Sequence, residues 1–134
     1  MAGLLIALSI IFFGVGTFIG KVALQTETAI TVYLFEALGT LTVFFLVALF
    51  FWKDALAATS HMNWEGYAFG VCYGLGTLTF IGALKYWPAS VVTPLSALYV
   101  VITVILAIIF LGEAITLKTG IGIACALAAV YFLT

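Results

Sequence analysis

Charged residues are scarce in this sequence. Only 7% of its 134 residues are Asp, Glu, Lys or Arg, whereas 66% are apolar and the mean hydropathy is +1.39. A soluble domain has roughly 25% charged residues, and this chain could not cover a water-facing surface with so few. The shortage of charge excludes a soluble protein and indicates an integral membrane protein embedded in the lipid bilayer.

The residue sets that several other functions need are also missing. Four lysines against five acidic residues provide no basic surface for nucleic acid. Cys72 and Cys125 lie in apolar runs, where cysteine serves as a small packing residue, and His61 stands alone in a polar stretch. Since no metal-ligand spacing, nucleophile–base pair or phosphate-binding loop occurs, we expect no enzyme activity, no metal and no cofactor.

Five long apolar runs make up most of what is present. A membrane-spanning helix needs about 20 largely apolar residues, and no basic segment precedes the first run to make it a cleavable signal. We therefore expect an all-α membrane protein, one domain over residues 1–134, with five transmembrane helices. The expected helices are about 2–24, 30–52, 66–87, 89–111 and 117–134.

Tryptophans and lysines mark the ends of these runs. Trp52, Trp64 and Trp87 lie at run ends, where indole side chains prefer the membrane interface. Loops on the N-terminal side hold two lysines and loops on the other side hold two more, so the positive-inside rule gives no preferred orientation. The sequence predicts insertion in both orientations and an antiparallel dimer. Weaker cues that fix one orientation are the alternative. The lysines of the two sides are Lys53 and Lys118, and Lys21 and Lys85.

One acidic residue lies well inside an apolar run. Glu36 follows the start of the second run by about two turns, or roughly 9 Å at 1.5 Å per residue. A carboxylate at membrane depth costs about 3 kcal/mol unless it faces protein or water, so such a residue is functional by default. Tyr33 and Thr40, at i−3 and i+4, share its helix face.

Three interpretations of Glu36 stay open. In the first it faces a cavity, where it binds a proton or a cation. In the second it forms a structural ion pair with Lys21 or Lys85, whose long side chains end on the same side of the membrane. In the third it reaches water at the interface.

The fourth run combines a proline with a polar stripe. Pro94 has no N–H and leaves the carbonyl of Ser90 without its helical partner, so a kink is expected. Ser96, Tyr99 and Thr103, at i, i+3 and i+7, lie on one face just beyond it. The stripe forms either a cavity wall or a set of hydrogen bonds between helices.

Glycines recur every four residues in two runs. Gly66, Gly70 and Gly74 share a face of the third run, and Gly16 and Gly20 repeat the spacing in the first. Such faces let helix backbones approach closely in lipid. We interpret them as packing surfaces, without knowing whether the partner helix belongs to the same chain.

The last two runs resemble a known family. The segment PASVVTPLSALYVVITVILAIIFLGEAITLKTGIGIACALAAV, from Pro88 to Val130, is similar to the closing half of an EamA-type domain of the drug/metabolite transporter superfamily. The matching features are the two prolines, the Leu-Gly-Glu turn that ends at Glu113, Thr116, and Gly120 in the final helix. We expect Glu113 and Thr116 to hydrogen-bond the turn and the start of the next helix.

The resemblance implies a fold and a partner. The usual transporter of this superfamily has ten helices, built as two five-helix repeats of opposite topology with the substrate site between them. This chain resembles one repeat, so a site at the repeat interface requires a second, inverted copy. Many family members carry a basic or neutral residue where this chain has Glu36, so the substrate class does not follow from the resemblance.

Together these features predict a secondary transporter or exporter of small polar metabolites or drugs. It would be a multi-pass protein of the plasma membrane that works by proton- or ion-coupled alternating access as an antiparallel homodimer. A heterodimer with an oppositely oriented paralogue, and a non-transporting accessory or assembly subunit, are the alternatives. Acidic Glu36 favours cationic or zwitterionic substrates or proton coupling, and Lys21 tunes its charge. The predicted substrate-binding residues are Glu36, Tyr33, Thr40, Ser96, Tyr99, Thr103 and Lys21.

Overall fold

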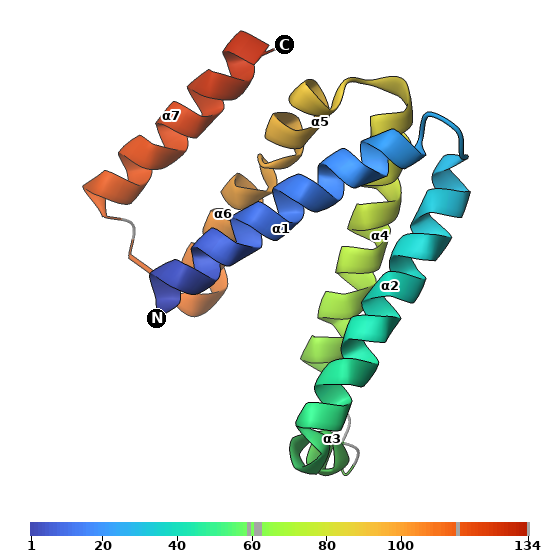
Figure 1. Cartoon of the computed structure of the whole chain (residues 1–134). Coiled ribbons are helices and arrows are strands. Elements are labelled where there is room, and N and C mark those ends of the chain that lie inside the picture. Colours follow the sequence, from blue (N-terminus) through green and yellow to red (C-terminus); the bar gives the residue numbers. More distant parts are fainter. Residues whose placement is uncertain (59, 61–62, 115, 134) are drawn as a thin grey trace. The chain divides into compact units, whose positions relative to one another are not determined.

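The computed structural model describes residues 1–58, 60, 63–114 and 116–133, and these residues form α-helices joined by short connections (Figure 1). His61 and Thr134, the expected end of the fifth run, lie outside the described residues. The chain folds into two compact units, Met1–Tyr86 and Trp87–Thr134.

The first unit contains three long helices. They are α1 (Ala2–Ala23), α2 (Ala29–Phe50) and α4 (Trp64–Tyr86), each 22 or 23 residues long and apolar enough to cross a membrane. The Oγ1 atom of Thr28 accepts a hydrogen bond from the N–H of Thr31 at 3.2 Å, which fixes the start of α2. Helices α2 and α4 run side by side in opposite directions, and α1 also contacts α4 (Figure 1).

A short helix joins α2 to α4. The segment between the second and third apolar runs contains helix α3 (Trp52–Ala58). Good helix formers fill α3, and Asp54 in its first turn is favourable near the positive end of the helix dipole. Asn63 then accepts a hydrogen bond from the N–H of Gly66 at 2.6 Å and caps the start of α4.

The second unit contains α5 (Ala89–Ser96), α6 (Tyr99–Leu111) and α7 (Leu117–Leu133), with α5 packed against α7. The fourth apolar run is thus one candidate span by length and composition, but two helices by backbone geometry. Pro94 cannot donate the hydrogen bond that a regular helix needs. A few residues later the chain tightens into i to i−3 bonds, with the N–H of Leu98 on the carbonyl of Leu95 and that of Val100 on Ala97, both at 3.1 Å.

The turn between α6 and α7 depends on glycine. Gly112 has a φ of 65°, a left-handed conformation that ends the helix and suits a residue without a side chain. The N–H of Glu113 bonds the carbonyl of Ala107 at 3.3 Å, so Glu113 supports the turn through its main chain. The Oγ1 atom of Thr116 accepts from the N–H of Thr119 at 3.2 Å, which confirms the expected role of Thr116 at the start of α7.

The described helices confirm an all-α membrane protein in outline. Four candidate spans are present, Ala2–Ala23, Ala29–Phe50, Trp64–Tyr86 and Ala89–Leu111, together with the shorter apolar helix Leu117–Phe132. At 1.5 Å per residue this last helix is roughly 24 Å long, somewhat less than a hydrocarbon core of about 30 Å. The count of five crossings and the half-transporter architecture stay predictions.

Few side chains are buried within the described residues. The buried hydrophobic ones are Leu24, Ile81, Leu84 and Val92, whereas most large apolar side chains of the long helices are exposed. A soluble protein would bury many more of them. The exposed apolar surface therefore needs lipid, or another protein, to cover it.

Candidate functional site

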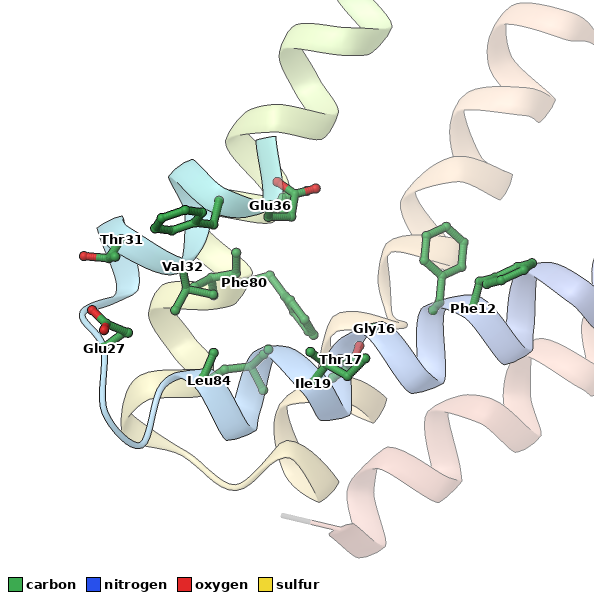
Figure 2. Close-up of a pocket in the computed structure, with 16 residues that line it drawn as sticks. Phe12, Gly16, Thr17, Ile19, Glu27, Thr31, Val32, Glu36, Phe80 and Leu84 are labelled. Atoms are coloured by element: carbon green, nitrogen blue, oxygen red, sulfur yellow. The ribbon is translucent and has the colours of Figure 1, made fainter. Parts of the chain in front are cut away.

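The first unit has a partly open cavity of about 570 Å³ between α1, the start of α2 and the second half of α4 (Figure 2). Its wall is mostly apolar, with four phenylalanines and a few polar side chains. The lining residues are Phe12, Phe13, Gly16, Thr17, Ile19, Gly20, Ala23, Glu27, Thr31, Val32, Phe35, Glu36, Thr77, Phe80, Ile81 and Leu84.

Glu36 lies on this wall. It is two turns inside α2, and its Oε1 atom accepts a hydrogen bond from the Oγ1 atom of Thr40, one turn further along the same helix, at 3.2 Å. The local bond satisfies one of the carboxylate lone pairs and leaves the rest to a ligand or water. This arrangement favours the interpretation in which Glu36 faces a cavity.

Both lysines that the sequence offered as ion-pair partners bond main-chain carbonyls. The Nζ atom of Lys21 donates to the carbonyl of Leu84 at 2.6 Å. The Nζ atom of Lys85 donates to the carbonyls of Leu24 and Glu27, at 2.8 and 3.0 Å. Each lysine lies in the last turn of its own helix and reaches the end of the other one. The ion-pair interpretation of Glu36 stays a prediction.

The other predicted residues of the first unit, Tyr33, Thr40 and Lys21, are not among the residues that line the cavity. Thr40 supports Glu36 directly. Tyr33 lies on the side of α2 that faces α4, because its hydroxyl group is only 3.4 Å from where a side chain on Gly74 would begin. An added Cβ atom on Gly74 would thus make an ordinary contact with Tyr33, whereas Gly16 and Gly20 have open space beside them and line the cavity.

The polar stripe of the fourth run belongs to the second unit. The hydroxyl group of Ser96 donates to the carbonyl of Thr93 at 2.8 Å, and that of Thr103 donates to the carbonyl of Tyr99 at 3.1 Å. Both bonds lie within the local helix, so these two hydroxyl groups do not tie helices together through them. A substrate-binding role for Ser96, Tyr99 and Thr103 stays a prediction.

The sequence reasoning missed a second carboxylate. Glu27, in the connection before α2, lines the same cavity as Glu36, and Figure 2 shows Thr31 and Val32 between the two. Glu27 resembled an ordinary loop charge, since it lies at the end of an apolar run. The threonines Thr17, Thr31 and Thr77 and the phenylalanine rings were missed as well, because helix packing alone brings them together.

The lining suits a particular class of ligand. Its charged members are the two glutamates, and its rings can contact the apolar part of a ligand or a cation above the ring face. A cationic or zwitterionic molecule with apolar groups fits this chemistry. Among the described residues, no group of three or more His, Cys, Asp or Glu side chains is placed to hold a metal ion.

The whole chain matches a known family. A model of the EamA-like transporter family covers residues 1–134. The chain is also 32% identical, over 121 residues, to the uncharacterized protein MJ1333.1 of Methanocaldococcus jannaschii, and the match covers 90% of this chain and 85% of that protein. No solved structure matches.

Proposed function

The chain belongs to the EamA-like transporter family, and from this premise we propose that it is a secondary transporter or exporter of small polar metabolites or drugs. Membership makes it a multi-pass membrane protein of the drug/metabolite transporter type, in a family whose members are generally not enzymes. The proposal adds the plasma membrane as its location and protons or another ion as the coupled species.

The position of Glu36 carries this proposal. A carboxylate two turns inside a membrane-spanning helix, on the wall of a cavity, is costly unless the protein uses it. In the proposed cycle Glu36 binds either a proton or a cationic substrate, but not both at once. Competition of this kind couples proton movement to substrate movement without a nucleotide-driven motor.

The proposed active form is an antiparallel homodimer. The balanced lysines, the large exposed apolar surface and the ten-helix plan of the family support it. Accessory-subunit function is not favoured, because the family match covers the whole chain.

In this dimer the remaining predicted residues shape the path of the substrate. Tyr33 and Thr40 shape the polar surroundings of Glu36. Ser96, Tyr99 and Thr103 line another part of the substrate path. Lys21 contributes its positive charge in a state in which its bond to Leu84 is broken. These roles are proposals that rest on residue chemistry and on position in the helices.

Replacement of Glu36 with glutamine tests the function. We expect Glu36→Gln to lower proton-driven uptake of organic cations into proteoliposomes at least tenfold and to abolish its pH dependence, because the amide cannot exchange a proton for a cation. Tetraphenylphosphonium, ethidium and guanidinium are suitable probes. The matched control is Glu65→Gln in the first turn of α4, which should keep normal uptake. Unchanged uptake and pH profile in Glu36→Gln would contradict the proposal.

Reporter fusions to the C-terminus test the dimer. We expect comparable reporter signals from both sides of the membrane, because the four lysines are evenly divided. Removal of Lys53 and Lys118 together should shift the population toward one orientation, with the loops of Lys21 and Lys85 in the cytoplasm. A single orientation of the unmodified chain would rule out the antiparallel homodimer and leave an oppositely oriented partner chain as the remaining route.

A further inference from the structure

The lysines at the ends of α1 and α4 form a crossed pair. Helix C-termini carry unpaired carbonyls and a negative partial charge, which a lysine in the last turn ordinarily satisfies within its own helix. Here each amine reaches across instead. Lys21 of α1 bonds the carbonyl of Leu84 in α4, and Lys85 of α4 bonds the carbonyls of Leu24 and Glu27 beyond α1.

The crossed bonds lie where the first unit is packed most tightly. Leu24 and Leu84, whose carbonyls accept these bonds, are only 4% and 1% exposed. Elsewhere α1 is loosely held, because α4 packs more extensively against α2 than against α1. Added Cβ atoms on Gly14, Gly16 and Gly20 would meet nothing within 4 Å. The two lysines are thus the principal polar tie described between α1 and α4.

The same residues bound the cavity. Ala23, Glu27 and Leu84 are lining residues, and they lie beside or within the crossed bonds. Figure 2 shows Leu84 and Glu27 at the end of the cavity that lies near the connection between α1 and α2. Phe12 lies on α1, far from that end. Separation of α1 from α4 at the lysines would open this end and leave the Phe12 region little changed.

We propose that Lys21 and Lys85 are a clamp that keeps one end of the cavity closed and releases it during transport. Lysine amines at a membrane interface can exchange a main-chain carbonyl for water through a rotation of their flexible stems, so the clamp is reversible. Loosely packed α1 is the element that moves. This inference rests on the proposed transport function, but its test requires no transport.

Cysteine labelling tests the clamp in nanodiscs, which expose both faces of the membrane. In a chain carrying Cys72→Ser and Cys125→Ser, one reporter is Ala23→Cys at the clamp end and a second is Phe12→Cys. A water-soluble maleimide is the probe. We expect Lys85→Met, alone or with Lys21→Met, to raise the labelling rate of Ala23→Cys at least tenfold and that of Phe12→Cys less than twofold.

Two controls separate a clamp from a simple structural support. Lys85→Arg keeps charge and N–H donors and should hold the Ala23→Cys rate within threefold of the original, whereas Lys53→Met should leave it unchanged. An unchanged rate in the methionine variants overturns the clamp. Equal increases at both reporters overturn it too, because they mean that the lysines hold the whole unit together. Since labelling needs no substrate, the clamp and the transport function of Glu36 can fail independently.

Discussion

The two units of the chain differ in what they contribute. Trp87–Thr134 contains most of the features that identify the family, namely the two prolines, the glycine-dependent turn and Thr116. Met1–Tyr86 contains the cavity, both of its glutamates and the crossed lysines. The family match covers both units, but the recognisable local motifs lie in the second unit and the candidate site lies in the first. Substrate preference therefore does not follow from family membership.

The physical reason lies in the kind of interaction that each unit uses. The distinctive features of the second unit are local backbone devices, such as the missing N–H of Pro94 and the positive φ of Gly112. Those of the first unit are contacts between side chains and distant main-chain atoms. Local devices leave a recognisable sequence pattern, whereas distant contacts do not.

A substitution that removes a buried side chain near the crossed lysines should destabilise the protein more than one at an exposed position. Leu84→Ala should lower the free energy of unfolding by about 3 kcal/mol, because Leu84 is 1% exposed and its removal leaves an unfilled space. Unfolding of the micelle-bound protein with increasing sodium dodecyl sulfate measures this. Leu49→Ala, at a position 73% exposed, is the matched control and should cost far less. An equal decrease in the free energy of unfolding for both variants would mean that packing around Leu84 contributes no more to stability than the exposed surface does.

Replacement of glycine with alanine should affect the stability of the two units differently. Gly112→Ala should destabilise the protein by about 1 kcal/mol, since a Cβ atom is strained at a φ of 65°. Gly70→Ala should be neutral or stabilising by up to about 1 kcal/mol, because it lies in a helix with nothing within 4 Å of the added atom. The same unfolding measurement applies. Destabilisation by Gly70→Ala would instead indicate that a partner helix packs on that face.

Several features of the sequence coincide with elements of the structure for identifiable reasons. The apolar runs coincide with α1, α2 and α4 to within a few residues at most ends, and the tryptophans lie at or next to helix ends. Helix α3 and the break after Ser96 were not foreseen in that form. Helix α3 has too few residues to show a clear helical repeat of apolar positions in the sequence. The position at which a proline-containing helix breaks depends on which i to i−3 hydrogen bonds replace the bond that proline cannot make.

The sequence by itself determined the membrane class, the family and the depth of Glu36, because hydropathy, turn chemistry and distance along a helix are all local properties. Only the tertiary structure decided the surroundings of that glutamate. It brought Glu27 to the same cavity and sent Lys21 and Lys85 to the carbonyls of each other's helix ends. These outcomes depend on how α1, α2 and α4 meet, and a long lysine stem can reach several partners until packing selects one.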